Sequence, residues 1–143
     1  MQQFAPEVVS IADACLGGLR GRSALLIGPE EQRAPYVYLL QRTGMKRIYQ
    51  ENTPFHVSPI LQQVQLLISI PASLPTGRLN EYPMLTAATV ARGCEGRHTP
   101  LLIFDLARTA SVEDLAGLLP AVCLYTPTDL HRILGRRLQA KAS

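Results

Sequence analysis

Hydrophobic and polar positions alternate along this chain in blocks that favour helices and buried strands in turn. A helical repeat of apolar residues that includes Val8, Ile11 and Cys15 predicts an amphipathic helix over residues 6–17, which ends at two glycines. Residues 24–27 are uniformly apolar, which is typical of a parallel strand covered on both faces. Further strands are predicted at residues 46–49, 64–70, 101–106 and 121–125, and further helices at 34–44, 82–92, 111–118 and 127–138.

This alternation predicts an α/β fold with three layers, in which helices cover both faces of a parallel sheet. We expect one domain over residues 1–143, with a leading helix within residues 6–20 and a C-terminal helix and basic tail over 127–143. In the helix expected at 111–118, Ser111 is predicted to be the cap and Asp114 the return residue of a capping box.

Composition indicates a globular protein, since 47% of the residues are hydrophobic and 17% are charged. The net charge of +3 is small, and the cations of the tail are interpreted as a solvated helix end rather than a nucleic-acid patch. No apolar run approaches the roughly 20 residues that a membrane span needs. Without a signal-peptide pattern either, we expect a soluble cytoplasmic protein that contacts no membrane.

The three cysteines offer little chemistry. Cys15 and Cys123 fall in a predicted helix face and strand, so both are interpreted as core thiols. Cys94 lies four residues before His98, and one cysteine with one histidine makes a poor metal site because tetrahedral zinc requires three or four ligands. No bound metal is expected.

The turn after the first predicted strand is the most informative segment of the chain. A dinucleotide-binding unit has G-x-G-x-x-G there, with glycines for the tight turn, for the approach of the pyrophosphate and for helix packing. In this chain those three positions are Gly28, Glu30 and Arg33. Only the first glycine is kept, although a different turn that still binds phosphate is the alternative.

Proline supplies a second argument about this turn. A helix that began at residue 29 or 30 would contain Pro35, at a cost of about 3 kcal/mol. We therefore expect the helix to begin near Ala34, withdrawn from the phosphate position. Glu30 and Glu31 would also repel a pyrophosphate by about 1–4 kcal/mol.

Four motifs in order resemble the NAD(P)-binding Rossmann domain of glutamyl-tRNA reductase. They are G-x-L-x-G-R-x-x-L-x-I-G ending at Gly28, the pair Arg47 and Ile48, P-L-L-I-F-D-L-A at 100–107, and A-V-C-L-Y-T-P-T-D-L at 121–130. The resemblance extends over residues 8–134 and implies a Rossmann-like sheet in a degenerate, stand-alone version. Only a dozen residues separate Thr53 from the next strand, so one strand–helix element is expected to be shortened or lost.

The departures from the family bear on the cofactor. The family's asparagine-arginine-threonine after the second strand reads Glu51, Asn52 and Thr53, so the arginine that faces the 2′-phosphate of NADP is missing. Glu51 could instead favour the ribose hydroxyls of NAD. If NADP or NAD still binds, the resemblance places its contacts at Gly28, Pro29, Glu30, Asn52, Thr53, Ser69 and Asp105. Asp105 alone could equally fix a loop.

Three hypotheses about function follow. The family's catalytic cysteine and tRNA contacts belong to a domain absent here, so no catalytic residue is expected, and the first hypothesis is a pseudoenzyme: a cofactor-free binding, scaffold or regulatory module with tetrapyrrole-synthesis proteins or a second copy as partner. The second is an NAD(P)-binding component that works with a separate catalytic chain. The third is a tetrapyrrole sensor with His56, His98 or His131 as the axial ligand.

Overall fold

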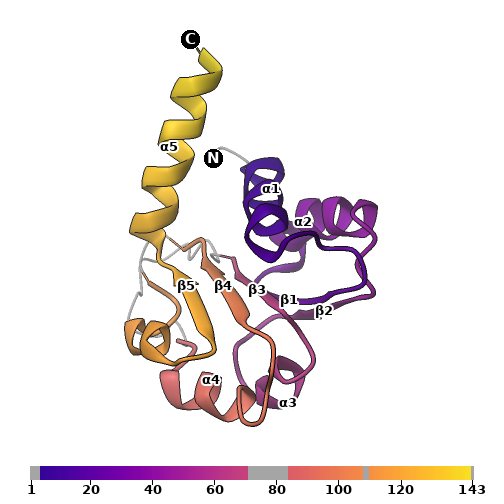
Figure 1. The fold of residues 1–143 in the computed structure, drawn as a ribbon, viewed down its shortest axis with the longest axis vertical. Coiled ribbons are helices and arrows are strands. Elements are labelled where there is room, and N and C mark those ends of the chain that lie inside the picture. The colour runs from indigo at the N-terminus through magenta and orange to yellow at the C-terminus, as the bar shows by residue number, and fades with distance from the viewer. Residues whose placement is uncertain (1–3, 71–83, 108–109, 143) are drawn as a thin grey trace.

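A five-stranded parallel sheet forms the centre of the molecule (Figure 1). The computed structural model of the chain describes residues 4–70, 84–107 and 110–142. The strands are β1 (Ser23–Ile27), β2 (Arg47–Glu51), β3 (Leu66–Ser69), β4 (Leu101–Asp105) and β5 (Val122–Tyr125). They stand in the order β2-β1-β3-β4-β5, and every neighbouring pair is parallel. All five strands and the parallel sheet are confirmed.

Helices cover both faces of the sheet, which confirms the three-layer α/β fold (Figure 1). One face carries α1 (Ala5–Leu16), α2 (Glu30–Arg42) and the base of α5 (Pro127–Ala142). The other face carries α3 (Ser58–Leu61), α4 (Ala87–Gly93) and the 3-10 helix η2 (Asp114–Leu118). With only four residues, α3 is the shortened element expected between β2 and β3.

The strands at the centre are apolar throughout because they contribute to two separate cores. In β1, Ala24 and Leu26 face α1 and α2, whereas Leu25 and Ile27 face α3 and α4. Every residue of β1, β3 and β4 is buried, as the uniformly apolar runs predicted. The edge strand β2 is half-exposed and correspondingly polar.

The order of strands reverses beside β1. The chain passes from β1 to β2 on one side and then returns to β3 on the other side of β1. In doubly wound sheets, ligands bind beyond the carboxyl ends of the strands at such a reversal. Gly28 follows β1 at this point, so the fold places the predicted turn where a Rossmann site belongs.

Two predicted helices differ from the structure. Ser111 does not cap a helix; it binds the carboxylate of Asp105, and η2 begins only at Asp114 as a 3-10 helix. The helix expected at 82–92 is α4, which begins at Ala87 behind the cap Thr86. Leu85 forms a parallel bridge with Val112 instead, and residues 82 and 83 lie outside the described ranges.

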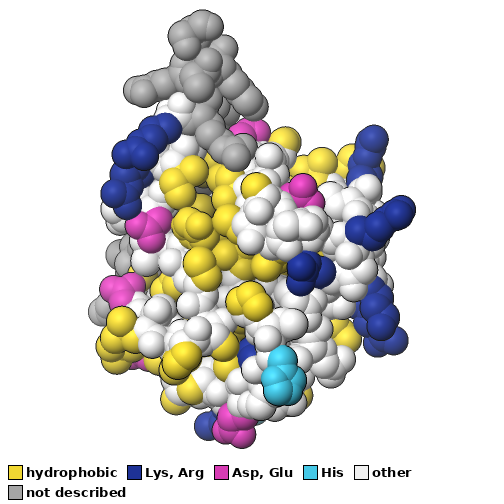
Figure 2. Space-filling view, viewed as in Figure 1, with side chains coloured by type: hydrophobic (Ala, Val, Ile, Leu, Met, Phe, Trp, Pro, Cys, Tyr) yellow, Lys and Arg dark blue, Asp and Glu magenta, His cyan; other side chains and the backbone are white. Residues whose placement is uncertain are grey.

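The interpretation of Cys15 and Cys123 as core thiols is wrong, because both are exposed. Cys15 lies in the last turn of α1, beyond the apolar stripe of Val8, Ile11 and Ala12 that packs on the sheet. Cys123 lies on β5, the outer strand on its side of the sheet. Hydrophobic side chains gather between α5 and the pair of α1 and α2 (Figure 2). The apolar periodicity predicted this helix and this strand correctly, but it did not show that the neighbouring elements leave Cys15 and Cys123 exposed.

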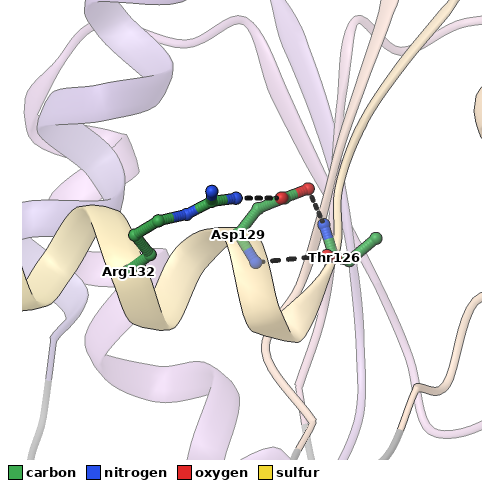
Figure 3. Close-up of polar contacts among 3 residues, drawn as sticks. All are labelled: Thr126, Asp129 and Arg132. Carbon is green, nitrogen blue, oxygen red and sulfur yellow. Dashed lines mark hydrogen bonds and ion pairs between the residues drawn. The ribbon is translucent and has the colours of Figure 1, made fainter.

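A reciprocal cap starts α5 (Figure 3). The Thr126 hydroxyl accepts from the Asp129 N–H, and the Asp129 carboxylate accepts from the Thr126 N–H, both at 3.1 Å. Arg132 donates to the same carboxylate at 2.9 Å, which holds it in place. The cap fixes the direction in which α5 leaves β5, with Leu130 and Leu134 buried at its base.

Candidate dinucleotide crevice

Gly28 forms the turn at the end of β1 and has no room for a side chain. It is buried, with φ of 145°, and its N–H donates to the carbonyl oxygen of Glu51 at 2.9 Å. A Cβ atom on this residue would lie 2.7 Å from the carbonyl oxygen of Ile70. The contacts that require glycine here come from the chain itself, where β1, β2 and β3 end together.

The expected start of α2 near Ala34 is wrong. The helix begins at Glu30, directly after the turn, and Pro35 lies inside it. The Pro29 carbonyl oxygen accepts from the N–H groups of Gln32 and Arg33, both at 3.0 Å. The proline costs the helix one hydrogen bond, and Glu30 and Glu31 offset part of this cost because they stabilise the positive end of the helix dipole. The helix N-terminus therefore stays beside the end of β1, where the phosphate position of a Rossmann site lies.

Arg33 occupies the position of the third glycine and is buried, with 7% of its surface exposed. Its Nη1 donates to Gln50 Oε1 at 3.1 Å, and its Nη2 donates to Asn52 Oδ1 at 2.9 Å. Its Nε is buried without a hydrogen-bond partner. Among the described residues no carboxylate lies within ion-pair distance of this guanidinium. The side chain thus joins α2 to the end of β2 through two neutral amides.

Sequence reasoning missed Arg33 as a site residue. It noted only that the family's arginine after the second strand is missing, whereas the structure supplies another guanidinium from the helix next to that strand. The signal was present in the sequence: Arg33 and Leu40 are seven residues apart, two helical turns, and both are buried on one side of α2. The expected late start of the helix hid that periodicity.

Ser69 and Asp105 belong to a separate network. Asp105 is 1% exposed, and its carboxylate accepts from the N–H groups of Ala107, Ser111 and Val112 and from the Ser111 hydroxyl, at 2.7–3.2 Å. The hydroxyls of Ser69 and Ser111 lie 2.7 Å apart. Burial raises the pKa of Asp105, and the four donors oppose that shift. Asp105 was left open as a cofactor contact or as a residue that fixes a loop, and these hydrogen bonds fix the loop that follows β4.

The seven candidate contacts therefore separate into two groups. Gly28, Pro29 and Glu30 lie at the end of β1, next to Asn52 and Thr53 at the end of β2. Ser69 and Asp105, at the ends of β3 and β4, are buried and bonded to Ser111. In the first group, the second glycine position carries an exposed carboxylate and the third a buried guanidinium. These residues do not fit the pyrophosphate and ribose of a dinucleotide.

The segment around Cys94 has a structural role. Arg97 donates to the carbonyl oxygens of Leu61 at 2.8 Å and Val64 at 2.6 Å, which ties the end of α4 to the end of α3. Burial raises the pKa of the Cys94 thiol. In the described part of the chain, no three histidine, cysteine or acidic residues gather as metal ligands.

Two further features bear on the tetrapyrrole-sensor hypothesis and on the expectation of no membrane contact. His56, His98 and His131 are all exposed and lie on three separate segments. Within the described ranges, no helix combines the length and the apolar character needed to cross a membrane.

Comparison with known proteins supports the resemblance. No protein-family model matches the sequence. Glutamyl-tRNA reductases of Pseudomonas entomophila and Pseudomonas fluorescens are 28% and 29% identical to it, over 93% of this chain and 34% of their own length. The enzyme of the same name from Methanospirillum hungatei is 27% identical over 87% of this chain. The chain spans about a third of the length of these relatives.

Solved structures agree. Glutamyl-tRNA reductase from Methanopyrus kandleri superposes with a TM-score of 0.76 and 18% identity, covering 98% of this chain and 38% of that one. Salmonella D-lactate dehydrogenase superposes with a TM-score of 0.51 and 11% identity, covering 80% of this chain and 40% of that one. The fold is Rossmann-like, and the chain resembles the NAD(P)-binding domain of glutamyl-tRNA reductase, as the motifs indicated.

Proposed function

We propose that this chain is a non-catalytic, glutamyl-tRNA reductase-like Rossmann module that acts by binding a protein partner. One observation carries the proposal: Arg33, in place of the third glycine, is buried and bonded to Gln50 and Asn52. The chain's own side chain then occupies the space between α2 and the end of β2, where a dinucleotide would place its adenosine ribose.

Opening this space for a ligand has a cost. The ligand would have to separate the Arg33 guanidinium from two amide oxygens, and each buried polar group left without a partner costs about 1–3 kcal/mol. At the second glycine position, Glu30 adds a Cβ atom and a negative charge where the pyrophosphate approaches the backbone. Both effects lower the affinity for NADP and for NAD.

Two further considerations support a role in binding. The resemblance places the family's catalytic cysteine in a domain that this chain does not match, so Cys15, Cys94 and Cys123 inherit no catalytic role from the family. With the fold kept, the module offers its surface to other proteins. Proteins of tetrapyrrole biosynthesis are the proposed partners, by analogy with the family.

The alternative function is an NAD(P)-binding component that works with a separate catalytic chain. It is favoured by the start of α2, because a helix that begins at Glu30 aims its first N–H groups at the crevice. The guanidinium of Arg33 beside Asn52 could also take the place of the family's arginine toward the 2′-phosphate of NADP.

Calorimetric titration with NADPH and with NADH separates the two functions. The proposal predicts no binding of either nucleotide at low-millimolar concentration to the wild-type chain. It also predicts that Glu30→Gly with Arg33→Gly, which restores both glycines, gains affinity, whereas the neighbouring Glu31→Gly does not.

Micromolar binding by the wild-type chain would contradict the proposal. If Arg33→Met then weakened binding of NADPH but not of NADH, Arg33 would be a ligand of the 2′-phosphate, and the alternative function would hold.

A further inference from the structure

Positive charge is concentrated in one part of this chain. Six of the 14 cations fall within residues 14–29 and 32–50, and these two segments contain no aspartate or glutamate. All 11 acidic residues lie outside them, where they outnumber the other cations. The net charge of +3 therefore combines a strongly positive part with a negative remainder. Such an asymmetry creates a local field at the surface that attracts an oppositely charged partner.

The fold brings these cations together at the end of the sheet where β1 and β2 begin. The Lys46 N–H donates to the Arg22 carbonyl oxygen at 2.7 Å, and the Arg20 side chain lies against Gly44, whose Cβ would stand 3.3 Å from the Arg20 Nε. Arg42 is the last residue of α2, two positions before this glycine. Lysine and arginine side chains line this edge of the molecule (Figure 2). We call the four exposed cations Arg20, Arg42, Lys46 and Arg47 the basic end.

No acidic side chain neutralises the basic end. Among the described residues, none of its four cations lies within ion-pair distance of a carboxylate. Asp13, near the end of α1, accepts from the Leu19 N–H instead, and Glu51 lies at the opposite end of β2. Arg22 adds a further positive charge behind the basic end, because its guanidinium donates only to backbone carbonyl oxygens, at 2.7 and 2.8 Å.

One guanidinium of the basic end is held ready for a partner. Arg42 Nη1 donates to the Tyr38 hydroxyl oxygen at 2.9 Å, and its Cζ lies over the Tyr38 ring, 5.6 Å from the ring centre. Tyr38 is itself 58% exposed. The remaining nitrogens of Arg42 match the two oxygens of a carboxylate, and a side chain already held in place loses less conformational entropy on binding. Arginine and tyrosine are also the residues that most often contribute binding energy in protein interfaces.

We propose that the basic end binds an acidic surface of a partner protein, one that presents several carboxylates close together. This inference rests on the proposed function and gives the chemistry of the partner. A protein fits better than a nucleic acid, because tight binding to nucleic acid involves about 6–10 phosphate contacts and the basic end offers four exposed cations on adjoining turns.

Fluorescence anisotropy with a labelled decaglutamate peptide at low ionic strength tests the basic end. The wild-type chain should bind the peptide, and Arg20→Glu with Arg47→Glu should weaken binding by about tenfold or more. Arg92→Glu with Arg136→Glu is the matched control, because it changes the net charge equally at exposed positions on α4 and α5. The control should change the affinity by less than about twofold.

A variant that keeps every charge tests the arrangement of the basic end. Tyr38→Ala removes the hydroxyl and the ring that hold Arg42, so it should weaken peptide binding by about threefold. An unchanged affinity would show that Tyr38 does not prepare Arg42 for a partner.

Two results would overturn the inference outright: no binding of decaglutamate, or equal weakening by the two double variants. Tighter binding of decauridylate, or of vesicles rich in phosphatidylserine, would overturn it in favour of a nucleic acid or a membrane. The nucleotide titration is separate, because the crevice lies at the opposite ends of β1 and β2. Binding of NADPH would contradict the proposed function without changing the peptide result, and failure to bind the peptide would leave the nucleotide result as it is.

Discussion

Arg33 and Asp105 show how single residues close a site from within. Arg33 extends a charged side chain from α2 to two amide oxygens at the end of β2. Asp105 does the reverse, offering a carboxylate to four donors of its own loop. Both residues are buried, and apart from the unpaired Nε of Arg33 their polar groups are bonded within the chain.

Replacing Asp105 by asparagine should destabilise the fold by about 2–4 kcal/mol. The amide keeps one acceptor oxygen for four donors and directs its NH₂ at N–H groups that need an acceptor. Urea unfolding measures the loss. Asp114→Asn is the control, since Asp114 is exposed, and its free energy of unfolding should stay within about 0.5 kcal/mol of the wild type. Equal losses in the two variants would show that the loop does not depend on this carboxylate.

The helices and strands were predictable where one physical signal decided them. The apolar runs of β1, β3 and β4 are buried on both faces, so composition alone identified them. The start of α2 was not predictable in this way, because the cost of Pro35 competes with contacts that only the folded structure provides, such as the bonds from Arg33 to β2. The loop after β4 escaped prediction because Ser111 binds Asp105 rather than a helix.

Since α2 includes Pro35 in its interior, Pro35→Ala should stabilise the fold. Restoring the missing hydrogen bond removes a cost of up to about 3 kcal/mol. The unfolded chain becomes more flexible without the proline, which lowers this gain in the free energy of unfolding by about 0.4–1 kcal/mol. Thermal unfolding should therefore show a higher Tm. Pro127→Ala should give no such gain, because Pro127 is the first residue of α5, where a proline loses no helical bond. A Tm unchanged or lowered by Pro35→Ala would mean that α2 is adapted to its proline.

At the scale of the whole molecule, the sheet brings distant segments to two separate places. The ends of β1 and β2 meet at the crevice, and β5 forms the opposite edge. The resemblance to glutamyl-tRNA reductase extends over nearly the whole chain but about a third of the relatives. The fold is thus retained, while the two changed glycine positions are where this chain's own function is to be sought.

Hydrogen exchange of the Arg33 side chain tests the central claim most directly. The Nε–H of a buried guanidinium exchanges slowly and gives its own resonance in a nitrogen-15 spectrum, assigned by its loss in Arg33→Met. We expect the Arg33 Nε–H to be protected, and neither its resonance nor its exchange rate to change when NADPH is added to low-millimolar concentration. A shift of that resonance with saturating NADPH would contradict the account, since the crevice would then open to a dinucleotide.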